Sequence, residues 1–441
     1  MGQILLYIFL AGTSVVAIAR PWIGVVVAYV FVILGPQHIW WWNFQGVRPF
    51  LLVAIPTVIG IVFAWVRKEI DFSFLQTKIN LLFFILFGCI TVSYLFGPYV
   101  LGGPGPRFQN PDLLYDRIWK TYFFYFMSTL CINDKRKFKY LSYVMIVSVI
   151  YLVYWANDQY LSGFWYGRMA GPKAFGQGLY VDENVFAMLF VTGLPFLYYA
   201  GFFLKNKIIR LGLWLVIPFG WHAIFLTGSR GGLLGLAFTV LLIAWRSPKR
   251  WISVLIIPAM LIAYQWQAGD VLKERAATIQ DYQAESSGGT RIQAWEASIQ
   301  MMKAHPLTGV GLGGMGPAFP VYSTHKPRVA HNAYLQTGAE SGLIAFVVYI
   351  SLVCYALVSL LKNEKKMQKI AKNSSINDNT LYLKCLNNGL FVSLCGFSFC
   401  ALFLSLNNFE PFFYIVLLIN FLHVYSRHSM LSVNSAKEIS Q

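Results

Sequence analysis

Long apolar runs alternate with short polar connections along most of the chain. A transmembrane helix needs about 20 mostly apolar residues to cross the hydrocarbon of a bilayer, and most of the runs approach that length. The pattern therefore predicts an all-α polytopic membrane protein with about 12–13 transmembrane helices. The first two runs, which Arg20-Pro21 separates, are the weakest pair. The runs cover approximately residues 3–19, 22–36, 49–66, 79–96, 117–132, 140–156, 184–204, 209–227, 231–245, 251–266, 338–361, 385–405 and 411–426.

The composition supports this interpretation. Of the 441 residues, 57% are hydrophobic and 12% are charged, whereas an ordinary soluble domain is about 25% charged. A soluble protein of this length would lack the charged residues needed to cover its surface, which excludes a soluble enzyme, a disordered chain and a fibrous repeat. The net charge of +17 does not indicate nucleic-acid binding, because the basic residues stand in short blocks between apolar runs, as in membrane topology.

When successive connections are assigned to alternate sides of the membrane, the basic residues collect on one side. One side receives most of the lysines and arginines, while basic and acidic residues nearly balance on the other. The positive-inside rule places the basic side and the C-terminus in the cytoplasm. The N-terminus lies outside with 13 spans, or inside if the first two runs are not both transmembrane spans. The basic 362–384 segment reads as a solvated linker. Three connections on the outer side are unusually long, namely 97–116, 157–183 and 267–337.

These features divide the chain into N-terminal transmembrane helices (1–183), central transmembrane helices (184–266), a long outer loop (267–337) and C-terminal transmembrane helices with a cytoplasmic tail (338–441). Within the loop, apolar residues recur at helical spacing from Thr290 to Ala304 and predict a helix. Such a helix would lie on or near the membrane surface.

Arg230 is the first candidate functional residue. It stands in 228-GSRGG-232, between two apolar runs at the outer face, where an arginine near the hydrocarbon is costly. Its guanidinium and the neighbouring glycines suit a phosphate group, because small residues allow close approach and guanidinium forms paired hydrogen bonds. The alternative is a tight turn whose arginine touches lipid headgroups.

Arg291 is expected in the first turn of the loop helix, where its charge would add to the positive end of the helix dipole. An arginine is slightly unfavourable there, which hints at anion binding. The alternative is a surface arginine paired with Glu285 or Glu296.

His331 lies where the loop meets the next span, in 328-RVAHNAYLQTGAESG-342. Histidine is the side chain best suited to accept a proton near neutral pH, so we expect it to be catalytic. Arg328, Asn332 and Tyr334 are possible substrate-binding neighbours. The alternative is an interfacial histidine with its polar tip in water, and His305 and His325 are rival candidates on the same loop.

Other polar residues on the outer side are less informative. Asp182-Glu183-Asn184 would cap the span that begins at 184, or contact sugar hydroxyls. Arg107, Arg168 and Lys173 would line an outer cleft, although nothing singles them out. The 311-GLGG-314 segment lacks a P-loop lysine and reads as a flexible turn. No Cys/His spacing suggests a metal site.

Four segments together resemble the O-antigen ligase and polymerase superfamily, over roughly residues 180–360. The N-terminal segment 20-RPWIGVVVAYVFVILGPQHIW-40 is similar to putative O-glycosylation ligases that accompany exosortase systems. The motifs are individually short, but their order and spacing are fairly specific for the superfamily. The four segments are 184-NVFAMLFVTGLPFLYY-199, 227-TGSRGGLLGLA-237, 290-TRIQAWEASIQMMKAHPLTGVGLG-313 and 331-HNAYLQTGAESGLIAF-346.

The resemblance implies a GT-C-like glycosyltransferase of the bacterial inner membrane, with a large helical periplasmic loop and its active site facing the periplasm. Such enzymes move a glycan from undecaprenyl diphosphate to an acceptor hydroxyl, without a cofactor, a nucleotide sugar or a metal. By position in the motifs, Arg230 and Arg291 would hold the diphosphate and His331 would activate the acceptor. Membrane lipids are the other expected partners, and a single displacement would invert the anomeric centre.

The resemblance leaves several functions open. The leading hypothesis is an O-antigen ligase that uses the lipid A–core as acceptor. An O-antigen or exopolysaccharide polymerase and a protein O-oligosaccharyltransferase belong to the same class. A transporter of lipid-linked sugars is the alternative from another class, and it would need ionisable residues at mid-span or broken helices near the bilayer centre.

Overall fold

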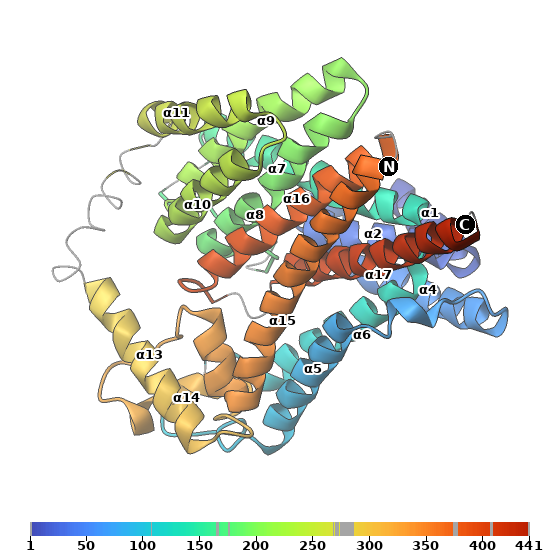
Figure 1. Cartoon of the computed structure of the whole chain (residues 1–441). Coiled ribbons are helices and arrows are strands. Elements are labelled where there is room, and N and C mark those ends of the chain that lie inside the picture. The colour runs from blue at the N-terminus through green and yellow to red at the C-terminus, as the bar shows by residue number, and fades with distance from the viewer. Residues whose placement is uncertain are drawn as a thin grey trace.

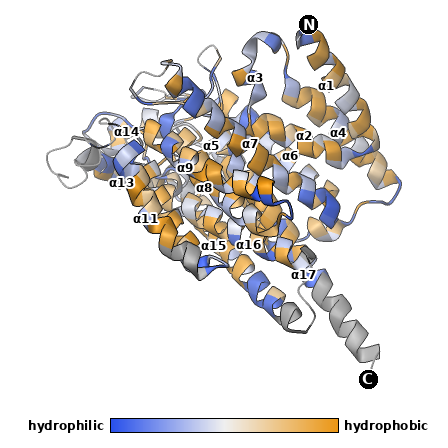
Figure 2. Cartoon of the chain, turned by 90° about the horizontal axis from the view of Figure 1, so that it is seen from above, coloured by the Kyte–Doolittle hydropathy of each residue, from blue (hydrophilic) through white to orange (hydrophobic). Residues whose placement is uncertain are grey.

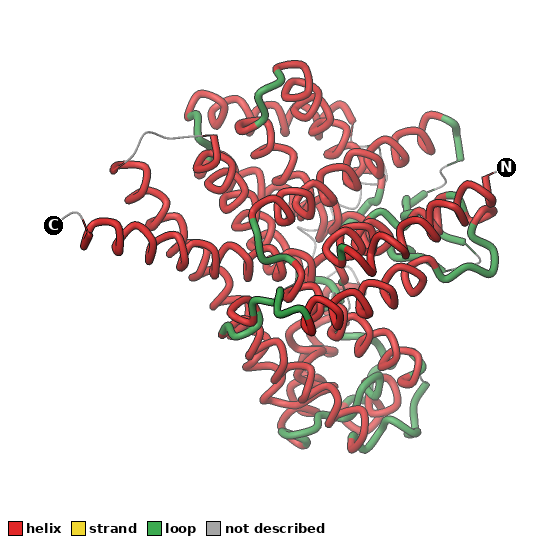
Figure 3. The backbone as a smooth tube through the Cα atoms, turned by 90° about the vertical axis from the view of Figure 1, so that its right-hand side faces the viewer, coloured by secondary structure: helices red, strands yellow, loops and turns green. Residues whose placement is uncertain are grey.

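The computed structural model describes residues 2–439, except 107, 165–166, 175–176, 268, 270–272, 274–285, 374–377 and 406–408. Most of the described backbone is helical (Figure 3), and its only β-type pairing is an isolated bridge between Ala174 and Gln177. The part of the predicted 267–337 loop between 274 and 285 therefore lies outside the described residues, as does Arg107.

The helices follow one another with short connections (Figure 1). Their bounds are α1 Gly2–Ala19, α2 Pro21–Ile33, α3 Pro36–Ile39, α4 Pro49–Val66, α5 Lys78–Phe96, α6 Pro111–Cys131, α7 Lys135–Leu161, α8 Glu183–Phe203, α9 Lys207–Leu226, α10 Arg230–Arg246, α11 Arg250–Gln267, α13 Ser286–Ala304, α14 Met315–Tyr322, α15 Ala333–Asn373, α16 Asp378–Cys400 and α17 Glu410–Ile439, with short 3₁₀ turns at Trp41–Asn43 and Phe72–Phe74.

The prediction of an all-α polytopic membrane protein is confirmed. Each predicted apolar run coincides with one described helix. Eight of these helices (α1, α4, α5, α7, α8, α9, α15 and α16) are long and apolar enough to cross a membrane, and α2 and α11 are apolar but shorter within the described residues. The remaining runs coincide with α6, α10 and α17, so the helices that meet the length and composition criteria are fewer than the 12–13 spans expected.

The distribution of apolar side chains is that of a helical bundle in lipid. The peripheral helix α1 leaves Ile4, Leu5 and Ile8 more than half exposed, and orange residues cover its outer side in Figure 2. Helix α8, by contrast, is almost wholly buried, and packs against α7, α9, α10 and α16. Apolar side chains on the outside of the bundle are stable only in a hydrocarbon environment.

The 362–384 segment differs from the prediction of a solvated linker. Helix α15 continues to Asn373 and helix α16 begins at Asp378, so most of the segment is helical. The reason is that lysine, glutamate, glutamine and methionine are good helix formers, and a polar composition alone does not end a helix that is already nucleated in the membrane.

The long connections assigned to the outer side gather at one end of the bundle, around α13 and α14 (Figure 1). The connection after α5 joins the 305–322 segment, because Tyr99 N–H donates to the Val310 carbonyl (2.9 Å) and Gly105 N–H to the Pro317 carbonyl (3.2 Å). In the same way the connection before α8 is tied to the end of α2, since the Tyr180 hydroxyl donates to the Ile33 carbonyl (2.7 Å).

A break in α15 fixes this end of the bundle. Gly342 has φ 90° and interrupts the helix. The carbonyls of Ala339 and Glu340, which lose their helical partners there, accept hydrogen bonds from Val310 N–H (2.8 Å) and Gly311 N–H (3.1 Å). The glycine-rich segment is thus a turn, as predicted, but a buried turn that caps the first part of α15 rather than a flexible one.

Gly309 provides a test of this contact. Its φ is +60°, and a Cβ atom there would lie 2.4 Å from the Glu340 carbonyl carbon, so Gly309→Ala introduces both a clash and backbone strain. We expect a loss of about 1–3 kcal/mol of stability, measured as a lower thermal unfolding midpoint of the purified protein. Gly88→Ala on α5 is the control, since nothing lies within 4 Å of a Cβ there. Equal midpoints for the two variants would contradict the packing described.

Candidate functional site

His331 occupies an unusual turn directly before α15. Its φ is +47°, a left-handed conformation that only one other described non-glycine residue, Lys68, adopts. The turn is fixed on its C-terminal side, where the Asn332 side chain accepts hydrogen bonds from Tyr334 N–H (3.1 Å) and Leu335 N–H (3.0 Å) and so caps α15. Backbone strain of this kind persists only where the surroundings impose it, and it is concentrated at functional sites.

Two other elements hold the same turn. Ala333 N–H donates to the Ala401 carbonyl (2.8 Å), which joins the start of α15 to the end of α16. On the other side of His331, the indole N–H of Trp295 on α13 donates to the Ala330 carbonyl (2.9 Å). The half-buried imidazole is therefore positioned by α13, α15 and α16 together.

Arg291 lies one helical turn before Trp295 and on the same side of α13, so it faces the His331 turn. The charges of Arg291 and Arg328 both act on His331. Contrary to the prediction, Arg291 does not stand in the first turn of its helix, because α13 begins at Ser286 rather than at Thr290.

These surroundings favour a neutral imidazole. Burial, together with the positive charges of Arg291 and Arg328, lowers the pKa of His331, while the negative charge of Asp182 opposes this shift. Burial is the largest of these effects, since it penalises the charged form. A histidine with a lowered pKa is unprotonated at neutral pH and is able to accept a proton.

Arg230 begins α10, in a turn that its neighbour Ser229 caps. The Ser229 hydroxyl accepts from Gly232 N–H (3.0 Å) and donates to the Asn184 side-chain oxygen at the start of α8 (2.7 Å). The turn also lies against the end of α16, where a Cβ on Gly231 would meet the Leu404 side chain at 3.2 Å. The residues at the end of α16 therefore contact both the Arg230 turn and the start of α15, which follows His331.

Arg168 completes this network. Its guanidinium donates to the Thr227 carbonyl (3.1 Å) and to the Asn184 side chain (3.3 Å), and lies 3.5 Å from the Glu183 carboxylate. Asp182 accepts from Asn184 N–H (2.8 Å) and caps α8, as the sequence predicted. Arg168 thus links the start of α8 to the end of α9 beside the Arg230 turn, a role that the sequence did not single out.

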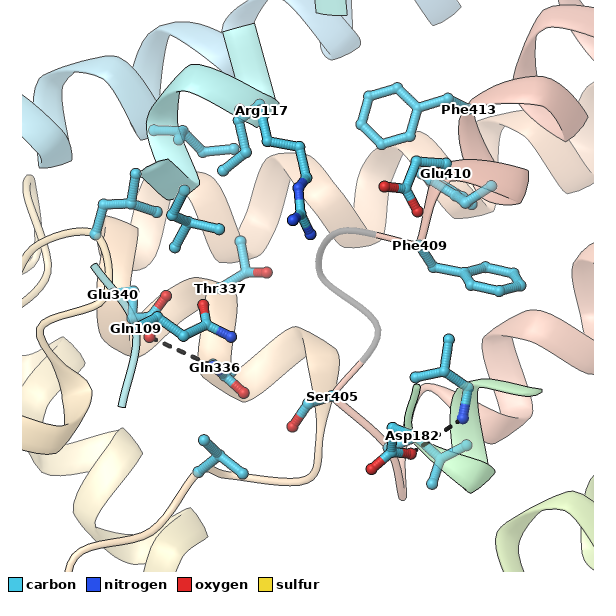
Figure 4. A pocket seen from close by; sticks show the side chains of 18 of the residues that line it. Gln109, Arg117, Asp182, Gln336, Thr337, Glu340, Ser405, Phe409, Glu410 and Phe413 are labelled. Carbon is cyan, nitrogen blue, oxygen red and sulfur yellow. Dashed lines mark hydrogen bonds between the residues drawn. The ribbon is translucent and has the colours of Figure 1, made fainter. Parts of the chain in front are cut away.

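A cavity of about 370 Å³ opens beside His331 (Figure 4). It lies where α5, α6, α8, α15 and α17 meet at this end of the bundle. Leu86, Tyr122, Tyr349, Phe412 and Phe413 are among the apolar and aromatic residues in its walls. The polar side chains that line it are Gln109, Arg117, Asp182, Asn184, His331, Gln336, Thr337, Glu340, Ser341, Ser405 and Glu410.

Of the residues proposed from the sequence as catalytic or diphosphate-binding, His331 lines this cavity. Asp182 and Asn184, which were expected either to cap a helix or to contact sugar hydroxyls, also line it. Asn332 is used as the cap of α15, and the Tyr334 hydroxyl donates to the Ser398 carbonyl (3.2 Å), so both residues contribute to positioning. Of the rival histidines, His305 forms a hydrogen bond with the Tyr322 hydroxyl (2.9 Å) and His325 is exposed. Lys173 is exposed and lies outside the cavity wall.

Arg117 and Glu410 were assigned no role from the sequence. Arg117 lies two turns into α6 and Glu410 begins α17. Both are ionisable residues at the edges of apolar runs, and such residues often mark functional sites in membrane proteins, a signal that was present but not used. Within the described residues, no three His, Cys, Asp or Glu side chains form a group that could hold a metal ion.

Comparison with known families gives a match for two regions of the chain. Residues 211–350 match the family model described as O-antigen ligase, a range that contains Arg230, Arg291 and His331. Residues 1–201 match a family of unknown function (DUF5935). No curated protein matches the chain.

Arg291 and Asp182 have opposing effects on the pKa of His331, so a pair of variants tests the arrangement. Removing the positive charge in Arg291→Gln should raise the pKa of His331, whereas Asp182→Asn, which keeps a capping side chain, should lower it. Diethyl pyrocarbonate modifies neutral imidazole, so the pH dependence of His331 modification, followed by peptide mass spectrometry, reports the change. The midpoint should move to higher pH in the first variant and to lower pH in the second. Shifts in the same direction, or none, would refute the arrangement.

Proposed function

We propose that the chain, whose residues 211–350 match the O-antigen ligase family model, transfers a glycan from undecaprenyl diphosphate to a hydroxyl group of the lipid A–core or a related acceptor. The single observation that carries this proposal is the position of His331, a proton acceptor held between cationic residues and a polar cavity. The basic connections lie at the opposite end of the bundle, which favours a periplasmic site in a bacterial inner membrane.

The cationic residues suit the donor. Arg291 and Arg328 act on His331 from the loop, and the Arg230 turn lies at the end of α16 next to the start of α15. When a lipid diphosphate leaves, negative charge develops on its oxygens, and fixed guanidinium groups in a partly dehydrated site stabilise that charge strongly. We therefore assign Arg230 and Arg291 to the diphosphate, with Arg328 as a further contributor of positive charge.

The neutral imidazole suits the acceptor. His331 removes the proton from the acceptor hydroxyl while the oxygen attacks the anomeric carbon of the glycan. The new carbon–oxygen bond forms as the bond to the diphosphate breaks, and undecaprenyl diphosphate departs with the bonding electrons. His331 then releases the proton to water. Attack from the face opposite the leaving group inverts the anomeric configuration.

A transporter is less well supported. The broken helix that a transporter would use near the bilayer centre is present at Gly342, but the break is bonded to the 306–311 segment, with Leu343 N–H donating to the Pro306 carbonyl (2.8 Å). It therefore belongs to the end of the bundle that holds α13 and α14. A polymerase uses the same chemistry with a second lipid-linked glycan as acceptor, and the assay below separates it from a ligase.

The test is transfer by the purified protein in liposomes that contain undecaprenyl-diphosphate-linked glycan, with and without the lipid A–core. Loss of the base in His331→Ala should reduce the rate by about 10²–10⁴-fold, and loss of a charge-stabilising donor in Arg230→Gln or Arg291→Gln by about 10²–10³-fold. His325→Ala, an exposed histidine of the same loop, is the matched control and should retain the rate.

Ligation requires the lipid A–core, whereas a polymerase lengthens the donor glycan without it. If correctly inserted His331→Ala and Arg230→Gln proteins transferred glycan at the unaltered rate, the assignment of these residues would be wrong. A product of retained anomeric configuration would exclude the single displacement.

A further inference from the structure

The charged residues around His331 are unevenly distributed. Arg291 and Arg328 act on the imidazole from the loop, and neither lines the cavity. The cavity itself is lined by three carboxyl groups, of Asp182, Glu340 and Glu410, and by one arginine, Arg117. Although the net charge of the protein is +17, carboxyl groups therefore outnumber arginines in this cavity. His331 stands at the boundary between a surface with arginines and a surface with carboxyl groups.

The distribution of charged residues indicates which substrate binds on the arginine side of His331 and which binds in the cavity. A diphosphate needs cationic groups and hydrogen-bond donors around its oxygens, whereas the cavity offers one arginine among three carboxyl groups. Hydroxyl groups, by contrast, donate hydrogen bonds to carboxyl and amide oxygens and accept them from amide and guanidinium groups. The cavity therefore suits a neutral compound that is rich in hydroxyl groups.

A buried amide points to the same kind of ligand. Gln336 is only 7% exposed and donates from Nε2 to the Glu340 carboxylate (3.3 Å). Its buried oxygen Oε1 has no hydrogen-bond partner among the described residues, and neither has the hydroxyl of Ser405 on the same cavity wall. Unsatisfied buried polar atoms are costly in a native protein, so an acceptor oxygen facing a cavity implies a donor group that binds there.

Arg117 and Glu410 provide further polar groups at the cavity. They extend towards one another from α6 and α17 (Figure 4), and the charge of Arg117 acts on the Glu410 carboxyl. No hydrogen bond or ion pair joins the two side chains within the described structure, and both side chains line the cavity. Aromatic side chains, including Phe409 and Phe413, stand beside them and give an apolar surface of the kind on which a sugar ring packs.

We propose that this cavity is the acceptor pocket and that it binds the neutral, hydroxyl-bearing end sugar of the acceptor through Gln336, Glu410 and Arg117, while the lipid diphosphate remains on the arginine side of His331. The inference rests on the proposed function and extends it by naming the class of acceptor. It also assigns Gln336, Glu410 and Arg117 as specificity-determining residues, distinct from the residues that bind the diphosphate.

The experiment separates the two Michaelis constants of the full-length protein in liposomes, with undecaprenyl-diphosphate-linked glycan as donor and lipid A–core as acceptor. Gln336→Leu, Glu410→Gln and Arg117→Gln should each raise KM for the acceptor by about 5–10-fold, as expected for the loss of one hydrogen bond, and leave KM for the donor within about twofold. Glu69→Gln, which removes an exposed carboxylate paired with Arg67 at the other end of the bundle, should change neither constant.

The outcomes are distinct. A higher KM for the donor instead of the acceptor would show that the diphosphate enters the cavity, and unchanged constants in all three variants would show that no substrate binds there; either result overturns the acceptor pocket alone. If the unaltered protein transfers no glycan to lipid A–core, the proposed function fails and the acceptor pocket with it. An unchanged KM for the donor also establishes that a variant is folded.

A second measurement uses the charge of the pocket. An acceptor whose end sugar carries a phosphomonoester should react with a higher KM than the same acceptor with a neutral end sugar, because carboxyl groups outnumber arginines in the pocket. Preference of the unaltered protein for the phosphorylated end sugar would overturn the proposal.

Discussion

The site depends on how one short turn of backbone is held. His331 adopts a left-handed conformation because the residues around it are each fixed by a different helix: Trp295 of α13 bonds the carbonyl before it, Asn332 caps the helix after it, and Ala333 is bonded to the end of α16. None of these contacts involves the imidazole. The ring is thus left to interact with substrate, while the strain of the turn is offset by hydrogen bonds that come from distant parts of the sequence.

This anchoring also explains why the imidazole separates two different electrostatic environments. The turn stands between the loop helix, which brings Arg291, and the ends of the membrane helices, which bring Asp182, Glu340 and Glu410. A glycosyl transfer needs positive charge where the diphosphate departs and hydrogen-bonding groups where the neutral acceptor enters. Both surfaces meet at one proton acceptor, and this arrangement is the basis of the single displacement that we propose.

Much of the fold followed from the sequence, for a physical reason. Apolar runs of about 20 residues have few alternatives to membrane helices, so the correspondence between runs and helices held even at the interruption by Arg20-Pro21. Polar segments were less predictable. The 362–384 segment is largely helical, and α13 extends back through two glycines to Ser286, because helix boundaries in polar regions depend on packing that local composition does not record.

The site was predictable only in part, for the same reason. His331, Arg291 and Arg230 could be identified from the sequence because each stands in a short motif with a clear chemical preference. Arg117 and Glu410, which are 293 residues apart, meet only through the packing of α6 and α17, and no local pattern connects them. Asn332 and Tyr334 were expected beside the substrate from their proximity to His331 in the sequence, yet their polar groups are used to fix the turn.

The most direct test of the account is a structure of the protein with undecaprenyl diphosphate bound, determined by cryo-electron microscopy in a lipid nanodisc. We expect the two phosphate groups to lie against Arg230 and Arg291, with the imidazole of His331 between them and an unoccupied carboxyl-lined cavity. Phosphate density inside that cavity, in contact with Arg117 and remote from Arg230 and Arg291, would contradict it.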